Sequence, residues 1–323
     1  MSGNMWAVTG VGGVAPEAGA EDDDWFDHRA RLGPRGYKYL PAAAQYLLAA
    51  ARDAVADGGT TDAVPADRRG AALALNGGFA ELFDTMDRQI ALESGAAGLS
   101  PATAPYFAVS LLGSRLTAEL GLKAFALTLA SPKVAALEAV EAGGRALAAG
   151  RCDTLLVGAA EHRLPKNPAG DGEQGAVALA LEPRAAAEAR GARIRGTVAA
   201  RSLFVPPGRE LPAGLVPDAV CRLLSDLDTT VEVHHVLDDS PFASGLAAAV
   251  DRVAGATGDV TPAGAGCLAA AQALARLLTG PPGTRLLTVA TREGHAALAL
   301  VRTRPDPYRN SETSHTSQKR GTL

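Results

Sequence analysis

Short apolar runs alternate with alanine-rich helical stretches along almost the whole chain of 323 residues. Apolar residues in continuous or alternating runs predict strands at 5–9, 70–75, 124–130, 154–158, 175–182, 193–201, 229–239, 285–290 and 296–302. Apolar positions at helical spacing predict helices at 40–56, 79–92, 104–119, 134–149, 214–227, 242–254 and 266–278. Buried strands that alternate with helices in this way predict a mostly parallel sheet with helices on both faces.

The second half of the chain repeats the order of elements of the first half, which indicates an internal duplication. Two such halves predict an α/β fold with α/β/α/β/α layers. We place the halves at residues 1–163 and 164–303. Residues 304–323 are polar, contain Pro305 and Pro307 and offer little to bury, so we expect a flexible tail.

Charge, hydropathy and cysteine spacing narrow the class of protein. The formal net charge is -4, which argues against a nucleic-acid partner. No apolar run reaches the roughly 18 residues of a membrane span, and no signal peptide is evident. Cys152, Cys221 and Cys267 lack CxxC spacing, so we expect free thiols in a reducing cytosol. The sequence thus predicts a cytoplasmic protein without a metal, a cofactor or a membrane partner.

A glycine-rich stretch, Gly10 to Gly13, follows the first predicted strand, and we expect it to form a turn. Such a turn could bind a dinucleotide. Its glycine spacing is incomplete, Pro16 comes early, and the acidic cluster at 21–24 lies in a polar loop instead of at a strand end. The stretch therefore does not predict a dinucleotide site.

The turn between predicted strand 124–130 and predicted helix 134–149 contains Lys133, at a place where α/β enzymes often carry a nucleophile. An amine there could be a nucleophile or an anchor for a carboxylate or phosphate. However, a cation at a helix N-terminus faces the positive end of the helix dipole, and an amine cannot carry a thioester. The residue type favours a former active site in which Lys133 fills space or pairs with a carboxylate.

Six segments resemble, in the right order, those of the β-ketoacyl synthases of the thiolase fold. They are WAVTGVGGVAP, GLSPATAPYFAVSLLGSRLTAELGLKAFALTLAS, AGRCDTLLVGAAEHR, VEVHHVLDDSP, GAGCLAAAQALARLL and TVATREGHAALAL. The resemblance covers nearly the whole chain. It implies the five-layered thiolase fold with two pseudo-duplicated halves.

The resemblance also implies a catalytic set that this chain has mostly lost. Such enzymes use a cysteine thiolate at a helix N-terminus, two histidines and a supporting lysine. In this chain Lys133 stands at the cysteine position, His234 at the first histidine, Ala265 at the second and Val260 at the lysine. The phenylalanine of the closing glycine-rich loop is lost at 291–294.

Such a set of residues resembles the chain length factors of type II polyketide synthases. These proteins lack the active cysteine, form a heterodimer with a catalytic ketosynthase and shape the tunnel in which a chain grows on an acyl carrier protein. This chain departs from them in carrying lysine where glutamine is common, and in its trimmed length. Both departures favour a divergent branch, such as one that makes reduced or polyene chains.

The resemblance points to two further surfaces. In the family, the strand before the nucleophile pairs across a two-fold axis, which here implies Phe125, Leu127 and Leu129 as partner-interface residues. Aromatic and apolar residues cluster in two neighbouring segments, where they form either core or the wall of an acyl tunnel: Phe79, Phe83, Met86, Tyr106, Phe107 and Leu111.

Other functions remain open. A decarboxylase or acyltransferase on the same fold would need His234 and a replacement donor, and an acyl-binding protein would need no partner. Cys267 could be a rescued nucleophile, but a small apolar residue in a packed helix is commoner. His234 and His235 precede two aspartates, which suggests a metal site, but neighbouring strand residues point to opposite faces. We therefore expect no metal there.

Overall fold

A computed structural model describes residues 5–17, 25–59, 64–92, 95–101, 105, 108–131, 133–162, 173–224 and 230–305. The strands are β1 (Trp6–Val14), β2 (Arg69–Ala74), β3 (Phe125–Leu129), β4 (Thr154–Glu161), β5 (Gly175–Glu182), β6 (Gly196–Phe204), β7 (Glu232–Leu237), β8 (Asp259–Pro262), β9 (Gly283–Ala290) and β10 (His295–Thr303). The α-helices are α1 (His28–Leu32), α2 (Ala42–Gly58), α3 (Ala80–Leu92), α4 (Leu111–Leu120), α5 (Ala135–Ala148), α6 (Arg184–Ala189), α7 (Leu215–Leu224), α8 (Pro241–Ala254) and α9 (Leu268–Thr279).

The strands form one continuous sheet whose order is a mirrored repeat, β3-β2-β4-β5-β1 followed by β6-β10-β9-β7-β8. The pairing repeats as well. β2 is parallel to β3 and β4, as β7 is parallel to β8 and β9. β5 is antiparallel to β4 and β1, as β10 is antiparallel to β9 and β6. The predicted internal duplication is therefore present in the topology.

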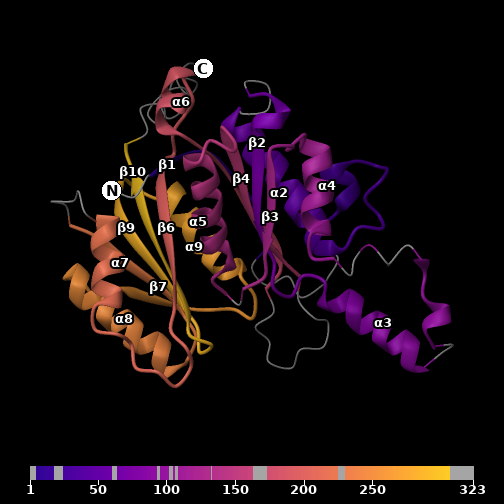
Figure 1. The fold of residues 1–323 in the computed structure, drawn as a ribbon. Helices are drawn as coiled ribbons and strands as arrows, with labels where there is room; N and C mark the ends of the chain where they lie inside the picture. Colours follow the sequence, from indigo (N-terminus) through magenta and orange to yellow (C-terminus); the bar gives the residue numbers. More distant parts are fainter. Residues whose placement is uncertain are drawn as a thin grey trace, which may run out of the picture.

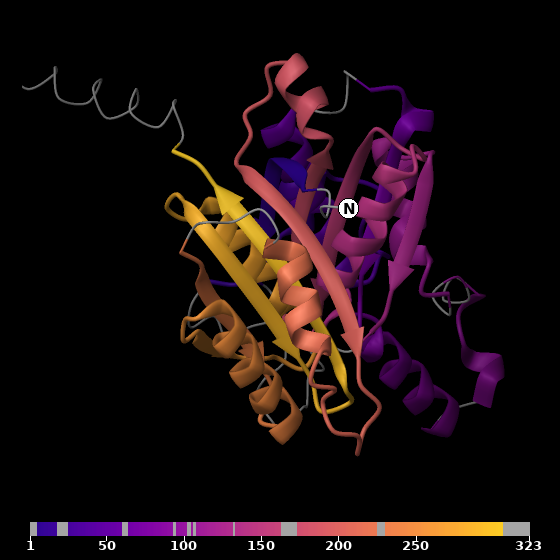
Figure 2. The same ribbon diagram turned by 60° about the vertical axis from the view of Figure 1, so that its left-hand side comes forward.

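Three apolar clusters divide the molecule into five layers. α2 and α4 cover the outer face of the first half-sheet, and α7 and α8 cover the outer face of the second. α5 and α9 lie between the two half-sheets and contact strands of both. Figure 1 shows this arrangement, and Figure 2 shows the long strand β6 beside β10. The predicted α/β thiolase fold with α/β/α/β/α layers is confirmed.

One detail of the predicted sheet is wrong. The sheet is mixed and not mostly parallel, because β4 runs directly back into β5, and β9 into β10, and a direct return gives antiparallel pairing. In the strand order, the first half-sheet ends with β5 and β1, and the second begins with β6. The short elements α1, α6 and β8 carry too little periodicity to be predicted, and residues 306–323 lie outside the described part of the chain.

The predicted glycine turn is also wrong, because Gly10 to Gly13 lie inside β1. Helix α2 crosses this strand so closely that a Cβ added at Gly10 would overlap the carbonyl oxygen of Ala54, and one at Gly12 that of Ala50. The glycines thus allow two backbones to approach, and no phosphate-binding loop exists there. No helix among the described residues is long and apolar enough to cross a bilayer.

We predict that Gly12→Ala destabilises the protein by more than about 2 kcal/mol, because backbone atoms cannot move aside as a flexible side chain can. Gly13→Ala is the matched control on the same strand, since an added Cβ at Gly13 meets nothing within 4 Å. Urea unfolding of both variants measures the difference. Equal stabilities would contradict the close approach of α2 to β1.

Candidate functional site

The turn between β3 and α5 holds Lys133 in a strained conformation. Its φ of 58° makes it the one residue other than glycine with a positive φ in the described part of the chain. Left-handed backbone is uncommon for a long side chain and costs of order 1 kcal/mol or more. A strained strand-to-helix turn is also the way that some α/β enzymes expose a nucleophile. The turn therefore has the geometry of a nucleophile position, with an amine in it.

The amine of Lys133 contacts a carboxylate of the other half of the molecule. Nζ lies 3.3 Å from Oδ2 of Asp238, which directly follows β7. The two side chains are only 18% and 5% exposed. This ion pair links the N-terminal end of α5 with the C-terminal end of β7. The ammonium group of Lys133 at the turn is therefore paired with a carboxylate.

Both carboxylate oxygens of Asp238 accept hydrogen bonds. Its Oδ1 accepts hydrogen bonds from the backbone N–H and hydroxyl of Ser240, and its Oδ2 accepts one from the backbone N–H of Arg292 at 2.7 Å. Burial alone would raise the pKa of Asp238, but these hydrogen bonds and the charge of Lys133 outweigh it, and the pKa lies below its usual value. Asp238 is therefore ionised at neutral pH.

Arg292 completes the network from the loop between β9 and β10. Its guanidinium group is ion-paired with Asp239, and its Nε lies 3.9 Å from Oδ2 of Asp238. Arg292 belongs to the loop in which the phenylalanine of the resembled family is lost. The wall opposite Lys133 thus consists of charged groups that are already paired with one another.

The start of α9, where the resemblance implies the second histidine, is occupied by a carboxylate. Oε1 of Glu161, at the end of β4, accepts hydrogen bonds from the backbone N–H and thiol of Cys267 at 3.0 and 3.1 Å. Glu161 also accepts from the backbone N–H groups of Asn76 and Gly77. Ala265 contributes only its carbonyl oxygen, which accepts from the Asn76 side chain at 3.2 Å.

A second carboxylate, Glu173, binds the next two amide groups of α9, those of Leu268 and Ala269, at 3.0 and 2.7 Å. Burial and the nearby charge of Glu161 raise the pKa of Glu173, and its backbone hydrogen bonds only partly offset this. The exposed N–H groups of a helix start are the usual place for an oxyanion or phosphate. Here Glu161 and Glu173 take that place, so α9 has little capacity to bind a further anion.

Two of the three cysteines, Cys152 and Cys267, are buried where a thiolate is disfavoured. Complete burial raises the pKa of Cys267 well above its usual value, and the nearby Glu161 and Glu173 raise it further. Burial also raises the pKa of Cys152, to about 11. Because the thiolate is the reactive form, both thiols are inert. Cys221 is exposed on α7.

His234 does not reach the turn that holds Lys133. Asp238 lies four residues further along the chain, directly after β7, which corresponds to roughly 13 Å at the usual rise of a strand. His234 and His235 point to opposite faces as predicted, with His235 bound to Asp251 at 2.9 Å. The described residues contain no group of three or more side chains suited to a metal ion. Val260 lies on β8 and is 62% exposed.

Four of the six proposed tunnel residues lie in the described part of the chain. Phe79 and Phe83 pack beside the outer layer of the first half, and Met86 is buried on α3. Leu111 is half-buried, while Tyr106 and Phe107 lie outside the described residues. Helix α3 itself projects from the body of the molecule in Figure 1. The structure supports core packing for Phe79, and a tunnel role for the six residues stays a prediction.

The proposed interface residues Phe125, Leu127 and Leu129 lie on an edge of the sheet. β3 pairs only with β2, and all three side chains are half-buried. The opposite edge is β8, the equivalent of β3 in the repeat. An unpaired edge offers free N–H and C=O groups to another strand, so β3 is available for pairing with a partner.

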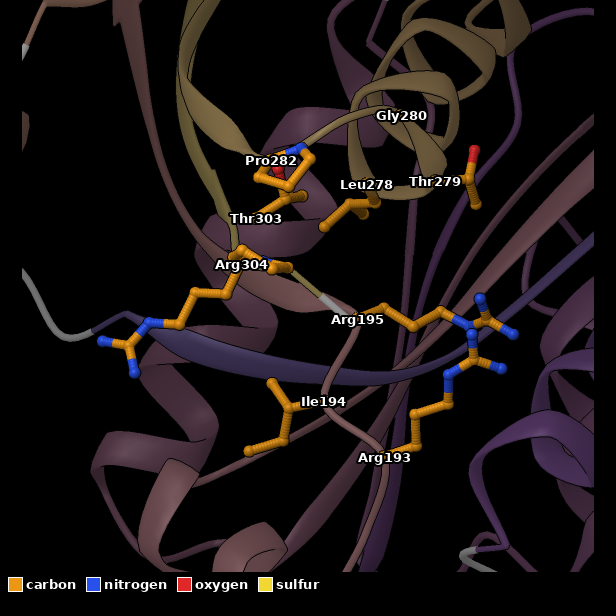
Figure 3. Close-up of a pocket in the computed structure, with 10 residues that line it drawn as sticks. Arg193, Ile194, Arg195, Leu278, Thr279, Gly280, Pro282, Thr303 and Arg304 are labelled. Atoms are coloured by element: carbon orange, nitrogen blue, oxygen red, sulfur yellow. The ribbon is translucent and has the colours of Figure 1, made fainter. Parts of the chain in front are cut away.

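A cavity of about 380 Å³ lies between the segment before β6, the C-terminal end of α9 and the end of β10. In Figure 3 the guanidinium groups of Arg193 and Arg195 lie together, while Arg304 points away from them. Arg195 is ion-paired with Asp57, whose pKa is lowered although burial acts to raise it. The positive charge of this cavity is thus partly neutralised from within the protein.

Sequence analysis missed most of the polar network. The doublet of Asp238 and Asp239 was visible as an acidic loop after a strand, and Glu161 closes the segment AGRCDTLLVGAAEHR. Those signals could have placed both carboxylates at strand ends. Glu173 and Arg292 had no comparable signal, because their partners are distant in sequence and come close only through the fold.

We predict that Asp238→Asn lowers the free energy of unfolding at pH 7 by about 2 kcal/mol, the scale of hydrogen bonds to a buried charged group. The depressed pKa of Asp238 means that its contribution is present above the unfolded value, near 3.9, and is lost as pH falls through the lower folded value. The gap between the variant and the wild type should therefore narrow below about pH 4.

Urea unfolding at pH 7 and at about pH 3, below the unfolded value, tests this. Asp239→Asn is the matched control, because its side chain is 86% exposed and exposed ion pairs contribute little. A gap for Asp238→Asn that does not change with pH would contradict the proposed charge network.

Comparison with known proteins agrees with this geometry. The sequence profile of the β-ketoacyl synthase N-terminal domain matches residues 8–202, more than half of the chain. No curated protein matches the chain in sequence.

Solved structures of ketosynthases share the fold. The ishigamide ketosynthase/chain length factor has a TM-score of 0.75 at 15% identity, covering 94% of this chain and 100% of that one. A type II polyketide synthase acyl carrier protein in complex with its ketosynthase has a TM-score of 0.69 at 17% identity. The match covers 93% of this chain and 100% of that one. An oxazolomycin ketosynthase domain from Streptomyces albus has a TM-score of 0.64 at 15% identity. The match covers 93% of this chain and 96% of that one. Identities this low establish the fold alone.

Proposed function

Because this chain belongs to the β-ketoacyl synthase family, we propose that it is a non-catalytic subunit of the chain length factor kind. It pairs with a catalytic ketosynthase and helps to shape the tunnel in which a polyketide chain grows on an acyl carrier protein. The observation that carries this proposal is the turn before α5, where Lys133 replaces a thiol and is paired with Asp238.

The chemistry of condensation requires groups that this site lacks. A thiolate must accept the acyl chain, and positioned donors must stabilise the oxyanion that develops. The amine of Lys133 cannot form a thioester, and the thiol of Cys267 is buried against two carboxylates. Ala265 has no side-chain donor, and the amide groups at the start of α9 are bound to Glu161 and Glu173.

The open edge at β3 supports a subunit over a protein that acts alone. The strand presents apolar, half-buried residues along an edge that β2 covers on one side only. Pairing with the same strand of a ketosynthase would join two sheets and bury this edge, as large obligate interfaces do. The fold similarity to the ishigamide ketosynthase/chain length factor is consistent with such a pair.

The other two functions have less support. A decarboxylase or acyltransferase would need His234 close to a second polar group at the turn, and His234 lies lower on β7. An acyl-binding protein that acts alone would be soluble and monomeric, whereas a subunit should be insoluble or self-associated until a ketosynthase is co-expressed. Expression with and without the partner separates these two possibilities.

We predict that the isolated chain does not become acylated by an acyl carrier protein or an activated thioester, since no accessible thiolate stands at the turn. Intact-mass spectrometry after incubation with the acyl donor should show no adduct, and a catalytic ketosynthase treated in parallel should gain one. A stable acyl group on Lys133 or Cys267 would end the non-catalytic proposal.

We predict that Leu127→Pro abolishes co-purification with the ketosynthase partner, because proline removes a backbone N–H and strains an edge strand. Leu127→Asp should weaken the pair. Val260→Pro is the matched control, since it alters the equivalent strand at the opposite edge of the sheet. Circular dichroism identifies the variants that fold. A folded Leu127→Pro protein that co-purifies at the wild-type yield would place the interface elsewhere.

A further inference from the structure

A second cavity, of about 340 Å³, opens between β7, β8 and the last turns of α9. Its volume falls in the range of small-molecule sites. Aliphatic side chains line part of it, namely Val236, Leu277 and Leu287, and all three are buried. His234, the residue at the first-histidine position, lies in this cavity and not at the turn with Lys133.

Two of the charged groups in the cavity neutralise each other. Nε of Arg285 donates to Oε2 of Glu232 at 2.8 Å, and Nη1 of Arg285 donates to the hydroxyl of Thr303 at 3.0 Å. Arg285 is only 3% exposed, so this pair is a fixed part of the wall. Its net charge is zero, and it offers little attraction to a charged ligand.

Polar groups without a partner remain among the lining residues, and Arg276 and His234 carry two of them. Arg276, on α9, lines the cavity and has no ion-pair partner within the described residues. Nε2 of His234 is shielded from solvent and makes no hydrogen bond to any of them. The nearby Oε2 of Glu232 lies 3.9 Å away, beyond hydrogen-bonding distance. A buried polar atom without a partner costs roughly 1–3 kcal/mol, and a ligand that bonds to it would recover that energy.

From this arrangement we infer that the cavity binds a small organic carboxylate with an apolar body. The cavity holds one uncompensated positive charge, that of Arg276, which suits a monoanion. Arginine binds carboxylates well because its N–H groups match the spacing of the two oxygens. His234 Nε2 would hydrogen-bond to the same carboxylate, and the aliphatic wall would cover the chain.

The site is separate from the proposed function. It is lined by strands and a helix of the second half only, and it shares no residue with the turn of Lys133 or with the edge at β3. A metal ion does not fit, since no third suitable side chain stands near His234 and Glu232 within the described chain.

Titration calorimetry of the full-length chain with sodium hexanoate tests this site. We expect saturable binding of hexanoate, no binding of hexan-1-ol, and a Kd at least tenfold weaker in Arg276→Gln and in His234→Gln. Arg222→Gln is the matched control, because Arg222 is an exposed arginine on another helix, α7, and this variant should bind as the wild type does.

Circular dichroism confirms that each variant is folded, and the two variants provide independent tests should one fail to fold. The proposal is overturned if the wild type does not bind hexanoate saturably, if hexan-1-ol binds equally well, or if a folded Arg276→Gln or His234→Gln variant binds with unchanged affinity. None of these outcomes depends on acylation or on the ketosynthase partner, so failure here leaves the proposed function intact.

Discussion

The burial of α5 and α9 between two half-sheets is the constraint on which the rest of the structure depends. Each helix follows a strand of its own half and contacts strands of the other half. Their N-terminal ends, after Lys133 and Cys267, therefore lie beside the C-terminal ends of the parallel strands of both halves. Side chains from distant parts of the sequence meet there. In a layered fold of this kind, a site forms where the ends of two buried helices come close together.

Buried helix starts need negative groups, and the chain provides them in different ways. At α9, Glu161 and Glu173 bind the free amide groups directly. At α5, a lysine precedes the helix, which is unfavourable beside the positive end of the dipole. Asp238 offsets this, and its own charge is stabilised by Ser240 and Arg292. At this end of the strands, the charged groups that the structure describes are paired with one another.

The position of a residue in a motif and its position in the site can differ. His234 stands at the first-histidine position of the resembled sequence pattern, yet the group that faces the turn is Asp238, directly after β7. Because an extended chain advances by a fixed rise per residue, the four residues from His234 to Asp238 are enough to place them at two different sites. The sequence pattern treats these two sites as one. The polar surroundings of His234 belong to a different cavity, beside Arg276 and the Arg285–Glu232 pair.

The sequence by itself determined the classes of elements, the internal duplication and the family, because hydrophobic periodicity and the order of motifs are local properties. The resemblance implies that Lys133 and Ala265 stand where the family has a reactive thiol and an imidazole, and the identity of these two residues excludes both groups at those positions. Only the tertiary structure decided that Gly10 to Gly13 lie within a strand, because that depends on how closely α2 approaches β1. It likewise decided that Lys133 pairs with Asp238 and that Cys267 is sealed beside Glu161. Those contacts join residues more than a hundred positions apart, and local periodicity carries no record of which side chains two folded layers bring together.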